Sequence, residues 1–260
     1  MPISVHTGGS FKTSTMSTKV GGSWVPVKQG YVRVAGVWRL FYTADVVVVA
    51  PTSTSSQTAR NIFEAAQPGL WASTQSKRLL VNSAIAQLIV NSPGGSLGAF
   101  GGMLTIEVTP TGSISGNGGS SNSGVGQDAL SIIAGENIRV VNNGIIRGGG
   151  GGGGRGGYGG DGASTTGGQG GIGGRGQGID GNAAAGLAGA AGSGGSGTGG
   201  TGGTGGAYGS AGATGSTGSA GTFSAGFAGL AGGASGRAIV GYNRIIYSGT
   251  GTLLGGTTNS

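Results

Sequence analysis

The side chains that usually perform catalysis are few in this sequence and are not arranged for it. The chain has one histidine, His6, and no cysteine. Its seven acidic residues are scattered without paired spacing: Asp45, Glu64, Glu107, Asp128, Glu136, Asp161 and Asp180. Hydrolytic and metal centres need such groups clustered, as a nucleophile with its base or as a set of metal ligands. We therefore expect no catalytic residues, no metal site and no cofactor, and a protein that is not an enzyme.

Aromatic and polar residues that interrupt a glycine-rich tract are the better candidates for chemistry, and that chemistry is binding. Aromatic side chains contribute strongly to recognition surfaces. The interruptions fall where extended segments are expected to turn. The candidate binding residues are Tyr158, Asp161, Gln177, Asp180, Asn182, Tyr208, Phe223 and Phe227. A competing interpretation is that the two phenylalanines cover the edge of the tract or pack against neighbouring strands.

Glycine is concentrated in the second half of the chain. Residues 1–110 contain 12 glycines and all six prolines, whereas residues 148–236 contain 43 glycines and no proline. A disordered linker and a collagen-like chain are two interpretations, but collagen needs abundant proline. The third is a bundle of extended helices with three residues per turn, whose backbone N–H and C=O groups bond to neighbouring helices. Because such helices touch closely only where side chains are absent, this interpretation predicts faces of glycine.

The spacing of glycine varies along the tract in the way that a packed bundle requires. Residues 148–154 are glycine on all three faces, which suits a central helix. Segments 167–176 and 197–206 have two glycine faces, and segment 207–221 has one. The contact-face glycines include Gly150, Gly170, Gly203 and Gly212. This graded series favours an ordered bundle over a random linker.

The first half of the chain is typical of short β-strands. "VGGSWVPV" and "VAGVWRLF" share Val, Gly and Trp at a spacing of 14 and predict a small antiparallel β module over residues 1–43. Residues 44–110 predict a mixed, β-rich linker or shoulder domain. It is expected to hold a short helix in "SQTARNIFEAAQ" and strands over 78–91 and 103–109.

A repeat connects these strands to the glycine-rich half. "IEVTPTGSISGNGG" and "IRVVNNGIIRGGGG" align at a shift of 32, and a third copy near the C-terminus keeps the spacing from Ile245 to Gly255. Each copy predicts a β-hairpin or a β-arch. Residues 111–260 are therefore expected to form a glycine-rich domain with a β-frame over 111–147 and 237–260. The fold class is mostly β plus irregular structure, with a C-terminal bundle of extended glycine helices framed by short strands.

Charge and hydropathy exclude some partners. The net charge is +7, and most of the excess basic residues precede Asp45. No charged side chain occurs over 181–236, so no nucleic-acid surface is expected there. The segment "GRGGYGGDG" leaves open an RNA-binding protein of the Arg-Gly-Gly type, and the row Thr198, Thr201 and Thr204 leaves open a structural or ice-binding protein. The longest apolar run, residues 46–50, is too short to insert into a membrane.

The stretch "RVVNNGIIRGGGGGGGRGGYGGDGA" resembles the approach to the glycine-rich domain of the distal tail-fibre adhesins of T-even-type bacteriophages. This resemblance implies a sandwich of polyglycine-II helices at the fibre tip of the virion. Its exposed turns would contact an outer-membrane protein or a surface polysaccharide of a Gram-negative host. The N-terminal part would dock onto a phage fibre or tail protein, as a homotrimer or as a single copy on a trimeric fibre. The N-terminal module resembles small β modules of phage tail proteins, and the expected attachment residues are Trp24, Trp38, Arg33 and Arg39.

Overall fold

The structure is a computed structural model. It describes residues 3–7, 10–14, 17–20, 22–26, 29–34, 37–43, 45–90, 102–133 and 137–259.

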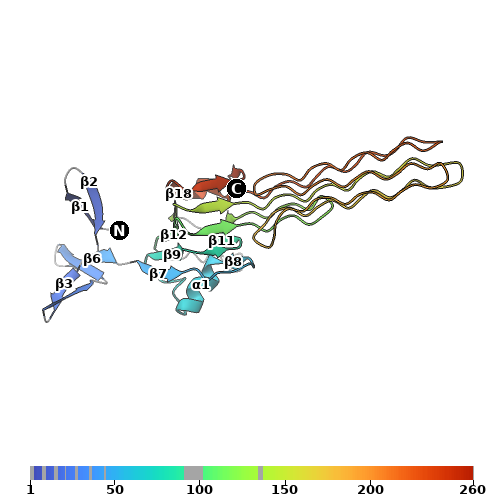
Figure 1. Cartoon of the computed structure of the whole chain (residues 1–260). Coiled ribbons are helices and arrows are strands. Elements are labelled where there is room, and N and C mark those ends of the chain that lie inside the picture. Colours follow the sequence, from blue (N-terminus) through green and yellow to red (C-terminus); the bar gives the residue numbers. More distant parts are fainter. Residues whose placement is uncertain are drawn as a thin grey trace.

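Three antiparallel hairpins form the described N-terminal part (Figure 1). The pairs are β1 (Ile3–Thr7) with β2 (Ser10–Ser14), β3 (Ser17–Val20) with β4 (Ser23–Pro26), and β5 (Gln29–Val34) with β6 (Val37–Thr43). Antiparallel pairing is confirmed. The described strands nevertheless form three separate two-stranded sheets instead of the single small sheet expected from the sequence echo.

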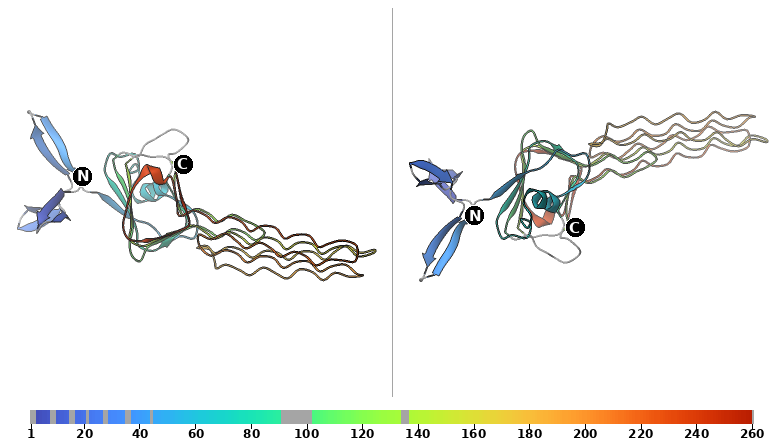
Figure 2. Two further views of the ribbon diagram at one scale, coloured as in Figure 1. Left: turned by 90° about the horizontal axis from the view of Figure 1, so that it is seen from above. Right: turned by 90° about the horizontal axis from the view of Figure 1, so that it is seen from below.

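From residue 46 the chain winds into a three-sided coil of parallel strands, here called the prism (Figures 1 and 2). Sheet 1 contains β7 (Val46–Val49), β9 (Lys77–Val81), β12 (Leu104–Val108), β15 (Ile138–Asn142) and β18 (Ile245–Ser248). Sheet 2 contains β10 (Ala84–Ile85), β13 (Ser113–Ser115), β16 (Ile145–Arg147) and β19 (Thr252–Leu254). Sheet 3 contains β8 (Gln57–Thr58), β11 (Leu88–Val90), β14 (Leu130–Ile132), β17 (Ile239–Val240) and β20 (Thr257–Thr258). The chain visits the three sheets in turn, so each sheet is built by stacking successive coils.

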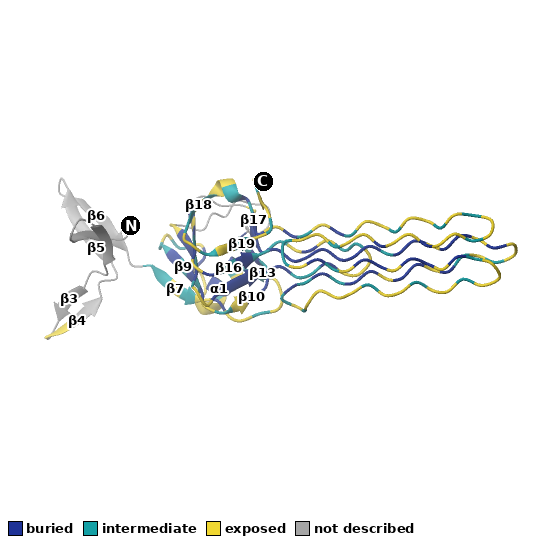
Figure 3. Ribbon diagram, turned by 45° about the horizontal axis from the view of Figure 1, so that its top comes forward, coloured by how far each residue is buried: buried dark blue, intermediate teal, exposed yellow. Residues whose placement is uncertain are grey.

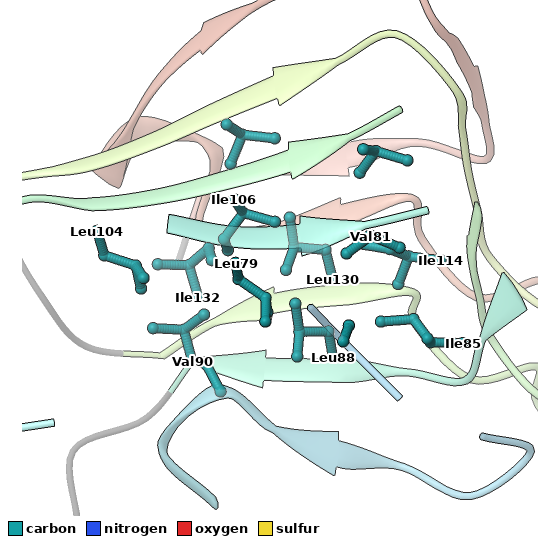
Figure 4. Packing of buried hydrophobic residues seen from close by; sticks show 14 of the residues in the cluster. Leu79, Val81, Ile85, Leu88, Val90, Leu104, Ile106, Ile114, Leu130 and Ile132 are labelled. Atoms are coloured by element: carbon teal, nitrogen blue, oxygen red, sulfur yellow. The ribbon is translucent and has the colours of Figure 1, made fainter. Parts of the chain in front are cut away.

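Alternating apolar residues create the core of the prism. Because successive side chains of a strand point to opposite faces, every second residue of each strand points inward. In sheet 1 the inward row of Leu79, Ile106 and Val140 is fully buried, and Ile85, Ile114 and Ile146 form the matching row of sheet 2 (Figure 4). Burying one such side chain stabilises the fold by about 1.5–3 kcal/mol.

The repeat is a β-arch, and its register differs in part from the sequence alignment. Its two strands lie in different sheets, so the hairpin alternative is wrong. Ile114 pairs with Ile146 at the expected shift of 32, but Ile106 pairs with Val140, a shift of 34. The turn over 109–112 is two residues longer than the turn over 143–144, and this even difference keeps the same side chains inward. The third copy is in the expected register, with Val140 opposite Tyr247.

Helix α1 (Ala59–Ala66) closes one end of the prism, as Figure 2 shows. It lies in the segment expected to be helical. The Thr58 side chain caps its N-terminus by accepting from the N–H of Asn61, 3.2 Å away. Ile62 and Phe63 are buried against the core, and the Phe63 ring lies 5.9 Å from that of Trp71. The 3-10 helix η2 (Tyr242–Arg244) lies at the opposite end (Figure 2).

The glycine tract leaves the prism at one corner, between sheet 2 and sheet 3. The chain departs after β16 and returns at β17 (Figure 1). Between them it forms six extended segments, defined as segment A (148–160), B (167–178), C (183–192), D (197–206), E (210–221) and F (226–236). A shorter excursion from the same corner, residues 116–127, is called the short hairpin. No helix or strand is assigned within segments A to F.

The prism contains strands from both sides of residue 110, the expected boundary between the shoulder domain and the glycine-rich domain. Strands β9 and β12, before that point, share sheet 1 with β15 and β18, after it. The described residues thus place the shoulder segment and the frame in the same three sheets. Among them, no helix combines the length and apolar character needed to cross a membrane.

Candidate functional site

Segment A is the centre of the glycine bundle. Its N–H groups donate to segments B and E and to the short hairpin, for example Gly153 to the C=O of Gly174 at 2.7 Å. Its C=O groups accept from segments D and F, for example Gly154 from the N–H of Gly203 at 2.8 Å. Counting both arms of the short hairpin, segment A has six neighbours among the described residues. This fits the expectation of a central position for residues 148–154.

The glycines of each contact face leave no room for a side chain. A Cβ atom on Gly150, Gly170, Gly203 or Gly212 would overlap a backbone carbonyl oxygen of a neighbouring segment. The face of segment D that carries Thr198, Thr201 and Thr204 is exposed instead. Figure 3 shows the resulting pattern, with buried positions inside the bundle and exposed ones outside. Close backbone packing therefore consumes the glycine faces, so that specific recognition must come from other residues.

The turns between segments lie at two opposite ends of the bundle (Figure 1). The proximal turns, 178–182 and 207–209, lie beside the prism. The distal turns, 161–166, 193–196 and 222–225, lie at the far end. The predicted binding residues are therefore divided into two groups.

The proximal group connects the bundle to the prism. The guanidinium of Arg147, at the end of β16, lies 3.8 Å from the centre of the Tyr208 ring. The side chain of Gln177 accepts from the N–H of Tyr208 at 3.3 Å. Asp180 pairs with Arg175 and accepts from the N–H of Gly118, and Asn182 is exposed beside it. Gln177, Asp180 and Tyr208 therefore make contacts within the protein, at the base of the bundle.

At the base of the bundle a charged pair, here called the clamp, joins the end of the short hairpin to the end of segment F. Asp128, which follows the short hairpin, accepts from the Arg237 backbone N–H at 2.7 Å and from its Nε at 3.0 Å. The Arg237 Nη2 atom lies 2.9 Å from the second carboxylate oxygen. The hydrogen bond to Asp128 raises the pKa of the Arg237 guanidinium above its ordinary value. The Arg237 guanidinium is therefore held in its charged form in the clamp.

Hydroxyl groups connect the distal turns to one another. The Thr165 hydroxyl bonds to Ser196 Oγ and to the C=O of Ser193. Thr222 donates to the C=O of Gly195 at 3.0 Å, and Ser224 accepts from the N–H of Asp161 at 2.7 Å. The three turns therefore form one connected surface at the far end of the bundle.

The distal group of predicted residues meets on this surface. Tyr158, Asp161 and Phe227 line one shallow hollow of about 310 Å³, together with Thr166 and two glycines. Phe223 lies on the adjoining turn, where its N–H donates to the C=O of Asp161 at 3.0 Å. The exposed fractions are 45% for Tyr158, 71% for Phe223 and 59% for Phe227. The phenylalanines are thus not buried against the prism, and the distal end presents aromatic rings, a carboxylate and hydroxyls to solvent.

The family model of the phage tail fibre adhesin Gp38 matches residues 45–258, which include the prism and the whole bundle. The chain belongs to this family of phage tail fibre adhesins. The adhesin is therefore a component of the virion, in the tail fibre.

A solved structure is also similar to the adhesin. It is the gp37-gp38 adhesin tip complex of the bacteriophage S16 long tail fibre, with 21% sequence identity, coverage of 84% of this chain and 82% of that chain, and a TM-score of 0.41. No curated protein matches the chain.

Several residues near the distal end are not among the residues predicted from the sequence. The turn 193–196 was not expected, although the phase of the glycine repeat slips between Gly195 and Gly197. Arg155, beside Tyr158, and the exposed Leu230 were also missed. Both interrupt a glycine face with a large side chain, and that interruption was the available signal.

The adhesin's predicted attachment residues lie in the N-terminal hairpins. Trp24 is in β4, Arg33 in β5, and Trp38 and Arg39 in β6, and the β5–β6 register places Arg33 opposite Trp38. The side chains of these four residues lie outside the described part of the structure.

The outer face of sheet 1 carries the adhesin's other group of charges. Arg78 on β9 pairs with Asp45 at 3.0 Å and with Glu107 on β12 at 3.1 Å. These groups border a hollow of about 200 Å³ together with Arg139. Elsewhere in the prism, burial lowers the pKa of the Lys77 ammonium. Within the described residues, no three His, Cys, Asp or Glu side chains are grouped to hold a metal ion.

Proposed function

We propose that this protein is the tip adhesin of its tail fibre and that the distal turns of the glycine bundle bind the host receptor. The observation that carries the proposal is the distal surface, where aromatic residues from two chain segments and a carboxylate are exposed at the end farthest from the prism. Aromatic anchors of this kind supply much of the binding energy at interfaces. The receptor is an outer-membrane protein or a surface polysaccharide of a Gram-negative host.

In this proposal segments A to F are polyglycine-II helices. Their hydrogen bonds recur every third residue, as in the series of Gly153, Gly156 and Gly159, which donate to Gly174, Gly171 and Gly168 at 2.7–2.9 Å. Three residues per turn is the period of this helix type, and it forms no hydrogen bonds within itself. Bonds to neighbouring segments hold such helices together, so the bundle presents its turns on a stiff support.

The N-terminal part, in the same proposal, docks the adhesin onto a fibre protein through Trp24, Arg33, Trp38 and Arg39. Binding to the host is non-catalytic in this proposal: the described lining of the distal hollow holds one acidic side chain and no histidine or cysteine. Nor does it involve nucleic acid, because segments C to F carry no charged side chain.

Competition with the virion tests the proposal. The purified full chain is expected to bind host cells and to block adsorption of the phage in a dose-dependent way. The double variant Phe223→Ala and Phe227→Ala should lose at least about tenfold in inhibitory potency, which corresponds to about 1.4 kcal/mol. Leu187→Ala on segment C, where the side chain is 60% exposed, is the matched control and should inhibit as the wild type does. Equal inhibition by both variants would contradict the assignment of the distal surface.

A further inference from the structure

The short hairpin covers only part of the bundle's flank. It packs along segments A, B and F and ends at its turn over 120–124, part-way along the bundle (Figure 1). Gly149 and Gly152 of segment A face its first arm, and Gly233 and Gly236 of segment F face its second arm. Beyond the turn, the two positions that the hairpin's arms occupy around segment A are open.

Both glycine faces change to large side chains where the hairpin ends. On segment A the face that begins with Gly149 and Gly152 continues, at three-residue spacing, with Arg155 and Tyr158. On segment F the face that begins at Gly236 and Gly233 continues outward with Leu230 and Phe227. The open positions beyond the hairpin are therefore bordered by side chains from two segments.

Backbone donors are also left free along this flank. Gly149 and Gly152 donate their N–H groups to Gln127 and Gly124 of the short hairpin at 2.8 and 2.7 Å. The next two N–H groups of the same series belong to Arg155 and Tyr158, and neither has an acceptor among the described residues. Another backbone segment cannot pack beside these two N–H groups, because segments approach each other closely only where the contact faces are glycine. A ligand here must contact side chains and reach the donors between them.

The hollow at the distal end of the flank combines polar and apolar surfaces. The Asp161 Oδ1 atom accepts from the N–H of Gly167 at 3.0 Å, while its Oδ2 atom has no partner among the described residues. The exposed Thr166 hydroxyl likewise has no hydrogen-bond partner among the described residues. The rings of Tyr158 and Phe227 form the apolar part of the lining. A volume of about 310 Å³ is at the small end of ligand sites, so a single ring fits best.

These features match a hexose. Adjacent sugar hydroxyls donate to a carboxylate and accept from N–H and O–H groups, and the apolar C–H face of the ring packs on an aromatic ring. The charge distribution selects a neutral sugar, because the Asp161 carboxylate repels an anionic one. The Arg155 guanidinium lies 5.2 Å from the Tyr158 ring centre but is not part of the lining, so Asp161 is the charged group that lines the hollow.

We infer that the hollow between Tyr158, Asp161, Thr166 and Phe227 binds one neutral hexose residue of a cell-surface polysaccharide, and that it exists because the short hairpin ends before it. This inference rests on the proposed adhesin function and specifies the ligand of its distal surface.

Saturation-transfer NMR on the full chain tests the sugar site directly. The probes are the methyl glycosides of glucose, galactose, mannose and N-acetylglucosamine at millimolar concentration. At least one should receive saturation at its ring C–H protons. Asp161→Asn, whose side-chain oxygen still accepts from Gly167, should weaken that binding at least about tenfold, because a donor replaces the free acceptor. Tyr158→Ala should abolish the signal, and Leu187→Ala should leave it unchanged.

Two results would overturn the inference. One is the absence of saturation transfer to all four glycosides, and the other is a signal that neither Asp161→Asn nor Tyr158→Ala reduces. Phage adsorption competition by the same protein sample separates this failure from that of the adhesin proposal. A chain that blocks adsorption yet binds no sugar retains its adhesin function and indicates a protein receptor, whereas a chain that does neither contradicts both.

Discussion

Gly203 and Thr204 are adjacent in segment D, but their side-chain positions meet opposite environments. The face of Gly203 lies against the C=O of Ala213, and its own N–H and C=O bond to Gly154 and Gly174 at 2.8 and 2.9 Å. Thr204 points to solvent. At the scale of single residues, stability therefore depends on whether a face is in contact, and much less on how apolar the residue is.

Gly203→Val tests this contact rule. A branched side chain here has to displace segment E, which breaks the hydrogen bonds of segment E to segments A, D and F. We therefore expect a loss of about 3 kcal/mol or more and little soluble folded protein. Thr204→Val should change the unfolding free energy by less than about 0.5 kcal/mol. Thermal melts followed by circular dichroism make the comparison, and equal melting temperatures would refute the rule.

The clamp at the base gives a second residue-scale prediction. Asp128→Ala removes three hydrogen bonds to Arg237 and should reduce the unfolding free energy by about 1–2 kcal/mol. Arg139→Ala serves as the control, because Arg139 forms no ion pair with another described residue. Urea denaturation measures both. The clamp has no stabilising role if the two variants unfold at the same midpoint.

At the scale of elements, the residues on one face of a bundle segment change along its length, according to whether another segment lies against that face. Gly152 and Arg155 belong to one face of segment A, three residues apart, but only Gly152 faces the short hairpin. The same face is thus a packing surface near the prism and a side-chain surface farther out. The point of change is set by the length of another element.

Gly152→Ala and Arg155→Ala separate these two uses of one face. A methyl group on Gly152 would overlap the C=O of Ser120, so we expect this variant to lose about 1–3 kcal/mol of stability. Arg155→Ala should remain within about 0.5 kcal/mol of the wild type, since its side chain makes only a long hydrogen bond to Gly170 at 3.4 Å and a contact with the exposed Tyr158 ring. Differential scanning calorimetry compares the two proteins. A larger loss from Arg155→Ala would show that the hairpin does not define the packed part of the face.

The periodicity of glycine made much of this element-scale design predictable. The period of three identified the central segment A and the two glycine faces of segments B and D, because a missing side chain directly indicates a close contact. The order of segments around segment A was not predictable, since a face of glycine has no side chains that could distinguish one neighbouring segment from another. For this reason Tyr208 and Phe223 were both expected in binding turns, although they lie at opposite ends of the bundle. The pairing of Ile106 with Val140, two residues beyond the position that the repeat predicts, was also not predictable, because the longer turn that causes it leaves the spacing of the repeat unchanged.

At the scale of the whole molecule, the bundle is an insertion in one corner of the prism. At the last corner, β19 and β20 are joined by only Gly255 and Gly256. Residues 148–236 extend the corresponding corner between β16 and β17, and the paired registers of the strands on both sides are unaffected. The prism thus contains all of its own hydrophobic core without the bundle.

Deletion of residues 148–236 should therefore leave a folded prism. Arg237 and Ala238 would then join Arg147 to Ile239 with a two-residue corner like that between β19 and β20. We expect β-type circular dichroism and a cooperative melt. An unfolded or aggregated product would show that the prism needs the bundle for its stability.

Binding of host cells by this deletion variant tests whether the bundle carries the receptor site. Fluorescently labelled wild-type and Δ148–236 chains, each shown to be folded, are added to the host strain and bound protein is measured by flow cytometry. We expect saturable binding of the wild-type chain, competed by unlabelled wild-type chain, and no specific binding of Δ148–236. Equal, saturable binding of the two would place the receptor site on the prism or the N-terminal hairpins and contradict the central claim.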